Sequence, residues 1–109
     1  MAYDEGVVER IRDAVRSRAG ITERKMFGGL AVMSRGHMFI GVIGDRLMAR
    51  IGHDEYEHAL SMPHVREMDF TGKPMKGYVY VEPEGFESDE ALEYWVNKSY
   101  QFAGTLPPK

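Results

Sequence analysis

Cysteine is absent from this chain of 109 residues. Its absence excludes disulfides, thiolate nucleophiles, zinc sites built on cysteine and redox chemistry by thiols. Long apolar runs are missing too, since no window approaches the roughly 20 apolar residues that a membrane-spanning helix requires. The N-terminal sequence MAYDEGVVER also lacks the basic and apolar regions of an export signal. We therefore expect a cytoplasmic protein with no membrane partner.

An excess of positive charge is also missing, because the formal net charge is −3 and the pI is about 5.8. Residues 1–50 carry nine Lys/Arg and six Asp/Glu, whereas residues 51–109 carry five and eleven, so the two halves are +3 and −6. Nucleic acids bind cationic side chains that neutralise phosphates, so direct nucleic-acid binding is not expected. One alternative stays open, a nucleic-acid accessory role for a basic N-terminal segment that comprises Arg10, Arg12, Arg16, Arg18, Arg24 and Lys25.

Helix signals recur along the chain, whose length fits a single domain over residues 1–109 with one core. Apolar residues at three-to-four spacing predict a helix from Asp4 to Ala19, which Asp4 caps and Gly20 ends. The sequences HDEYEHAL and SDEALEYWVNKSYQFA predict two further helices, capped by Asp54 and Ser88.

Six short apolar runs predict strands: ITERKMF, GLAVMS, HMFIGVI, RLMARI, VREMDF and YVYVEP. Arg35-Gly36 and Gly44-Asp45 are predicted to form two-residue hairpin turns. The order α-β-β-β-β-α-β-β-α predicts an α+β fold, in which helices pack on one face of a mostly antiparallel sheet. Eight methionines, and apolar residues on both faces of strands such as residues 38–42, indicate that the second face is also covered. A second subunit could supply that cover, so we expect a homodimer.

The loop MDFTGKPMKGYVYVEP contains the spacing Gly72-x-x-x-x-Gly77, which is the first half of a phosphate-binding P-loop. The Lys-Ser/Thr pair of that motif does not follow, and the next predicted element is a strand rather than a helix. Gly72, Pro74 and Gly77 are therefore predicted to shape a turn, and Gly28-Gly29 a bend or bulge. No cofactor is expected. The basic side chains near these turns are candidates for a partner or anion-binding surface: Arg24, Lys25, Lys73 and Lys76.

The sequence contains no recognisable motif for catalysis or metal binding. His53 and His58 lie five positions apart on a predicted helix and so point in different directions, and no serine lies in a strand-turn-helix elbow. We therefore expect no catalytic residues, no metal ligands and no enzyme activity. The alternative that stays open is an enzyme or small-molecule-binding domain, whose pocket between sheet and helix is lined by Tyr78, Tyr80, Trp95 and Tyr100.

Four stretches carry a resemblance to a known family: RKMFGGLAVMSRGHMFIGVIGDRLMARIG, DEYEHAL, MDFTGKPMKGYVYV and LEYWVNKSYQFAGTLPPK. In this order they resemble the N-terminal domain of the TfoX/Sxy family of competence regulators, from about Ile11 to Lys109. The resemblance implies a small α+β domain in which Met26 to Gly29 and Asp69 to Val79 are structural or surface features.

The family also implies a function. Its full-length members regulate transcription in DNA-uptake competence, together with a cyclic-AMP-responsive activator protein, and no catalytic residues come with the resemblance. Those members have a further helical C-terminal domain, which we expect to be absent because this sequence stops at Pro-Pro-Lys. We expect a non-catalytic regulatory and protein-interaction module, with a transcription regulator as a candidate partner.

Overall fold

The computed structural model describes residues 3–26, 28–69, 72 and 75–107. Within them, the helices are α1 (Glu5–Val15), α2 (His53–Leu60), the short 3-10 helix η1 (Pro83–Phe86) and α3 (Asp89–Gly104). A six-stranded sheet runs in the order β1-β2-β3-β4-β6-β5 and every pairing is antiparallel. Its strands are β1 (Ile21–Met26), β2 (Gly29–Ser34), β3 (His37–Ile43), β4 (Arg46–Arg50), β5 (Val65–Glu67) and β6 (Tyr78–Val81). The predicted α+β fold and element order are confirmed.

Two helix caps agree with the sequence prediction and one differs. The Asp4 side chain accepts hydrogen bonds from the amides of Gly6 and Val7, and Ser88 accepts one from the amide of Ala91. The prediction that Asp54 caps α2 is wrong, because the cap is Gly52, with φ of 87° and no side-chain bond. The backbone turns into the helix at this glycine, so Asp54 falls inside the first turn.

The first helix is shorter than predicted, because it ends at Val15 and not at Gly20. The chain tightens directly after it, where the amide of Arg18 donates to the carbonyl of Val15. Gly20, with φ of 74°, then turns the chain into β1.

Tight hairpins connect β2, β3 and β4, as the sequence predicts. Arg35 and Gly36 both have positive φ, 52° and 87°, which matches the right-handed twist of the flanking strands. Between these hairpins, Val32 pairs with Ile40 and Met33 with Met38, so Phe39 is an extra residue in β3. This bulge lets Phe39 and Ile40 both join the core on the helix side, where strict alternation would separate them.

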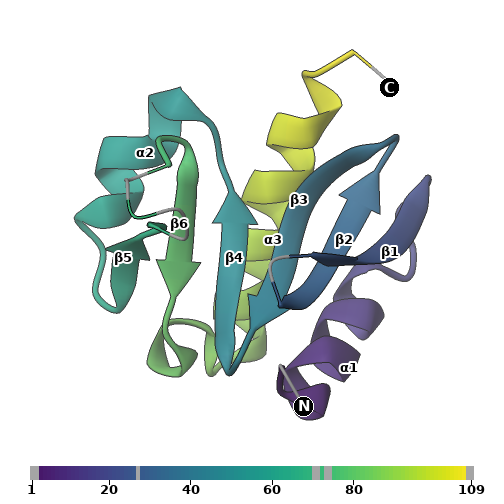
Figure 1. Cartoon of the computed structure of the whole chain (residues 1–109), viewed down its shortest axis with the longest axis horizontal. Coiled ribbons are helices and arrows are strands. Elements are labelled where there is room, and N and C mark those ends of the chain that lie inside the picture. Colours follow the sequence, from purple (N-terminus) through teal and green to yellow (C-terminus); the bar gives the residue numbers. More distant parts are fainter. Residues whose placement is uncertain (1–2, 27, 70–71, 73–74, 108–109) are drawn as a thin grey trace.

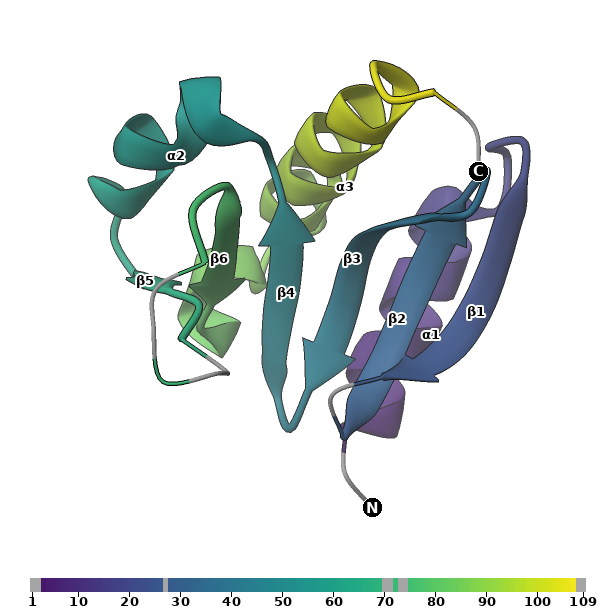
Figure 2. The same cartoon turned by 45° about the horizontal axis from the view of Figure 1, so that its top comes forward.

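Helices α1 and α3 cover one face of the sheet, with α1 behind β1 to β3 and α3 behind β3 and β4 (Figure 1). Figure 2 shows α2 beyond the β5–β6 end of the same layer. The core between the layers has Trp95 and Phe39 as its largest fully buried side chains. None of the described helices is long and apolar enough to cross a membrane.

The other face of the sheet, here called the outer face, is closed by side chains of the same chain. Met48 and Tyr80 pack there against Met68 and Met75, which lie outside the strands at either end of the segment that links β5 to β6. Met48 and Met68 are fully buried, and Tyr80 is 4% exposed. The cover that we expected from a second subunit is therefore supplied, over this part of the sheet, by the chain itself.

Candidate functional site

Arg12, Arg16 and Arg18 of the basic N-terminal segment are paired with acidic or amide side chains within the fold. Arg12 donates to Glu9 and Glu23, Arg16 pairs with Asp13, and Arg18 donates to Glu93 and Asn97. The hydrogen bonds from Arg12 lower the pKa of Glu23 and those carboxylates raise the pKa of Arg12. Paired in this way, these arginines keep little positive charge for a nucleic acid.

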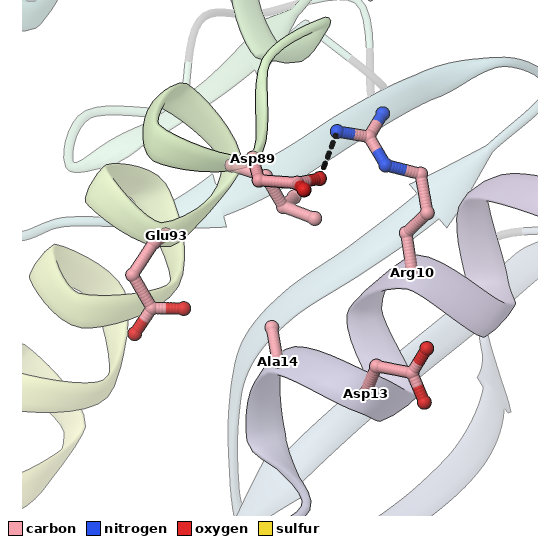
Figure 3. A pocket seen from close by; sticks show the side chains of 6 residues that line it. Arg10, Asp13, Ala14, Asp89 and Glu93 are labelled. Atoms are coloured by element: carbon pink, nitrogen blue, oxygen red, sulfur yellow. Dashed lines mark ion pairs between the residues drawn. The ribbon is translucent and has the colours of Figure 1, made fainter.

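Arg10 connects α1 to the start of α3 through hydrogen bonds. Its Nη2 donates to the carbonyls of Phe86, Glu87 and Ser88, at 2.9, 3.1 and 3.4 Å, and lies 3.6 Å from an Asp89 oxygen. Figure 3 shows this guanidinium beside Asp89. Both residues line an open groove with a volume of about 270 Å³. The remaining charges of the groove, on Asp13 and Glu93, already pair with arginines. The groove is therefore a structural contact between two helices.

Of the four basic residues predicted as a partner or anion surface, the three that the structure describes lie apart from one another. Arg24 lies opposite Ala31 of β2 in the strand register, on the outer face. Lys25 lies opposite Leu30, on the helix side, because neighbouring residues of a strand point to opposite faces. Lys76 precedes β6, which three strands separate from β1, roughly 19 Å away. Lys73 and Pro74 lie outside the described residues.

The predicted turn glycines have backbones that fit turns or close approaches. Gly28, Gly72 and Gly77 have positive φ, at 75°, 86° and 91°. Gly29 begins β2 with an ordinary φ, but a Cβ at this position would lie 2.1 Å from the carbonyl oxygen of Val42. A glycine is thus required at position 29 because the backbones of β2 and β3 approach closely there, and not because the chain turns.

The proposed aromatic pocket does not form, because its four members lie on two faces of the sheet. Trp95 and Tyr100 pack in the core between sheet and helices, whereas Tyr78 and Tyr80 belong to the clusters of the outer face. In β6 the residues that face the helices are Val79 and Val81. The prediction is wrong because strand alternation places the tyrosines of Tyr-Val-Tyr-Val opposite to the valines.

Arginines and tyrosines are combined on the outer face. One row of paired residues crosses all six strands and has an arginine at each end: Arg24, Ala31, Gly41, Met48, Tyr80 and Arg66. The guanidinium of Arg46 lies 4.0 Å above the ring of Tyr80, and that of Arg50 lies 5.3 Å from the ring of Tyr78. These cation–π contacts hold the two guanidiniums next to the tyrosine rings of β6.

Acidic side chains are fewer than arginines on this face. Glu82 lies 3.3 Å from Arg66 and 3.9 Å from Arg46, so one carboxylate serves two guanidiniums. Within the described ranges, Arg24 and Arg50 form no ion pair. Burial raises the pKa of Tyr80, Arg46 opposes that rise and Asp69 adds to it, so this phenol stays neutral.

Sequence reasoning missed Arg46, Arg50 and Arg66 as members of one surface. A signal for two of them was present, because Arg46, Met48 and Arg50 alternate with the core residues Leu47 and Ala49 in β4. Their stacking on the tyrosines of β6 depends on β4 and β6 being neighbours, and the helix α2 and strand β5 separate them in the chain.

A small pocket, here called the Arg50 pocket, lies where β4, α2 and β6 meet. Its walls include Arg50, His53, Lys76, Tyr78 and Phe102, and its volume is about 70 Å³. Gly52 and Gly77 complete the lining, and the amides of Ile51 and Gly52 both donate to the carbonyl of Gly77. No carboxylate lines it among the residues that the structure describes.

Groups that could hold a metal ion are not found in the described part of the chain, where no three His, Asp or Glu side chains converge.

No curated protein matches this sequence. The TfoX N-terminal domain family does match, over residues 13–103. That range covers the whole six-stranded sheet, α2 and nearly all of α3, but only the end of α1. The chain therefore belongs to the TfoX N-terminal domain family.

Proposed function

We propose that this chain is a non-catalytic regulatory module that binds an acidic segment of a partner protein through the outer face of its sheet. Membership of the TfoX N-terminal domain family supports a regulatory role. The observation that carries the proposal is the unequal pairing of arginines on the two sides of the molecule. On the helix side each of Arg12, Arg16 and Arg18 has its own carboxylate, whereas on the outer face Arg46 and Arg66 share Glu82.

An acidic protein segment fits this face because its cations are already fixed in position. Arg46 is held by the ring of Tyr80 and is about one-third exposed, so it loses little conformational freedom when a carboxylate binds it. A planar guanidinium can also bind a carboxylate through two hydrogen bonds. Met48, the one methionine in the row, is fully buried and packs with Met68 beneath this face.

The same geometry argues against the nucleic-acid alternative. Sequence-tolerant binding of single strands uses open aromatic faces on which bases stack. Here the ring of Tyr80 is buried beneath Arg46, and Arg50 lies over that of Tyr78. The net charge of −3 further weakens attraction to phosphates.

The expected homodimer remains part of the proposal, but through another surface. A two-fold interface places the same patch of both subunits face to face, so arginines would oppose arginines on the outer face. Light scattering measures the mass in solution, and the charge reversals Arg46→Glu and Arg66→Glu should leave that mass unchanged. Dimerisation that these reversals alter would place the second copy on the outer face and contradict an acidic partner there.

The binding test uses an acidic peptide as a stand-in for the partner segment. Addition of a Glu-rich peptide at low salt should shift amide resonances of β4 and β6, and 0.5 M salt should abolish the shifts. Combined reversal of Arg46 and Arg66 should weaken binding at least tenfold, whereas Arg16→Glu on the helix side should not. Shifts confined to α1 and α3, or stronger shifts with short single-stranded DNA, would overturn the proposal. A transcription regulator with an exposed acidic segment is the partner class that the family suggests.

A further inference from the structure

We propose that the Arg50 pocket binds a single phosphate group, either as free phosphate or as the end of a small phosphate ester. This inference concerns a small ligand and does not depend on the binding of a partner protein to the outer face. It rests on the cationic side chains that converge in the pocket, on its size and on the fixed backbone beneath it.

Three side chains that can carry positive charge come together here from separate elements. Arg50 is the last residue of β4, His53 the first of α2, and Lys76 precedes β6. Only the tertiary structure places these three side chains in one pocket. Among the described residues, no carboxylate lines the pocket to offset their charge. An anion that binds in this pocket is attracted by the cationic side chains that line it.

Arg50 is held in place before any ligand arrives. Its guanidinium lies 5.3 Å from the ring of Tyr78 and 5.5 Å from the ring of Phe102, so an aromatic side chain from the sheet and one from α3 both hold it. Contacts with the ring faces leave the N–H groups at the edge of the guanidinium free to bond an oxyanion. Within the described residues no carboxylate pairs with Arg50 or Lys76.

Glycines bring the backbone close beneath these side chains. Gly77 has φ of 91°, and a Cβ there would lie 3.2 Å from Cδ2 of His53. Gly52 has φ of 87°, and a Cβ there would lie 2.5 Å from the ring of Phe102. A larger residue at either position would displace a wall of the pocket. The motif Gly72-x-x-x-x-Gly77 is therefore no P-loop, yet its second glycine and the preceding Lys76 do contribute to this pocket.

The size of the pocket limits the ligand. A volume of about 70 Å³ equals roughly two waters at about 30 Å³ each, which suits one tetrahedral anion. Sites for complete nucleotides or drug-sized ligands measure about 300–1,000 Å³. The rest of a phosphate ester would thus remain outside the pocket. Phosphate also carries up to two negative charges, which suits a pocket lined by cationic side chains.

The test is a titration of the 15N-labelled protein with sodium phosphate, at ionic strength held constant with sodium chloride. We expect saturable shifts of the amides of residues 50–54 and 76–78. Lys76→Gln, at an exposed position, should weaken binding at least fivefold, and Arg50→Gln at least tenfold. The control Lys25→Gln, an exposed lysine on β1, should bind phosphate as the unaltered protein does. Amide spectra of all variants establish that they are folded.

A second titration with glycerol 3-phosphate distinguishes the two sources of the group. Tighter binding of the ester than of free phosphate would indicate a metabolite whose remainder contacts the rim, and equal or weaker binding would indicate free phosphate. Absence of saturation by either compound, or saturation that Lys76→Gln leaves unchanged, would overturn the proposal. These results are independent of the acidic-peptide test, because that test alters Arg46 and Arg66 and leaves the pocket residues in place.

Discussion

At the scale of single residues, adjacent glycines in this chain are required for different physical reasons. Gly28 has φ of 75° and open space around it, since a Cβ would meet no heavy atom within 4 Å. Gly29 has an ordinary φ, but its Cβ would overlap the carbonyl oxygen of Val42 in the neighbouring strand β3. Conformation limits the choice of residue at the first position, and backbone packing limits it at the second.

The two glycines should therefore respond differently to substitution. Gly29→Ala should lower the free energy of unfolding by about 2 kcal/mol or more, because β2 and β3 must move apart. Gly28→Asn should cost less than about 1 kcal/mol, because asparagine tolerates the left-handed region. Urea unfolding of both variants measures the difference. Equal losses would show that the close approach of Gly29 to Val42 does not limit this position.

At the scale of elements, Arg10 connects α1 to the start of α3. Its guanidinium satisfies the carbonyls of Phe86, Glu87 and Ser88, where η1 ends and α3 begins. The same guanidinium lies 5.8 Å from the ring of Phe86, which is 1% exposed. One side chain thus fixes the angle at which the chain leaves β6 and crosses behind the sheet.

Removal of this connection should destabilise the fold more than loss of an exposed ion pair. Arg10→Ala should lower the free energy of unfolding by about 1.5–3 kcal/mol, the range for hydrogen bonds from charged groups. The matched control is Arg16→Ala on the same helix, which breaks an exposed pair with Asp13 and should cost less than about 1 kcal/mol. Thermal or urea unfolding would contradict this role of Arg10 if the two losses were equal.

At the scale of the whole molecule, charge is distributed by layer. Carboxylates and arginines alternate on the helical layer and pair there, whereas the outer face combines arginines with tyrosines. The Arg12–Glu23 pair joins the helical layer to the helix side of the sheet, because it links α1 to β1 at 2.7 Å. Stability of the entire domain should therefore depend on pH through this carboxylate.

The direction of that pH dependence follows from the lowered pKa of Glu23. The unfolded chain titrates this group near about 4.3, so below that pH it takes up a proton that the folded state resists. The stabilisation by the pair is present above this value and is lost as the pH falls through the folded-state pKa. The difference in Tm between the wild type and Glu23→Gln should be largest near pH 7 and should shrink by pH 3. A difference that stays constant would rule out a contribution from this ionisation.

Much of the fold could be predicted from the sequence because its signals are local. The caps at Asp4 and Ser88 and the Arg35-Gly36 turn depend on a few neighbouring residues, and each is present as predicted. The predicted cap at Asp54 was wrong because Gly52 takes that role where the chain leaves β4. Phe39 was assigned no special place, since a bulge depends on the partner strand and not on β3 alone.

The candidate sites were harder to predict, because each joins residues from distant segments. Arg46 contacts Tyr80 because β4 pairs with β6, and the same pairing places Arg50 and Lys76 in the lining of one pocket. Lys76 and Gly77 stand out in the sequence because they belong to the spacing Gly72-x-x-x-x-Gly77, which resembles part of a P-loop. Nothing in the sequence indicates that they lie near Arg50. Strand alternation, applied to Tyr78 and Tyr80, would have removed the mistaken aromatic pocket.

By itself, the sequence determined the identity and order of the helices and strands, the turns between them and the family of the domain, because these depend on spacing and on residues close together in the chain. The tertiary structure alone decided which charges remain available to a ligand. Whether an arginine is neutralised, stacked or free depends on what lies opposite it. That is fixed by the packing of α1 on β1 and by the pairing of β4 with β6.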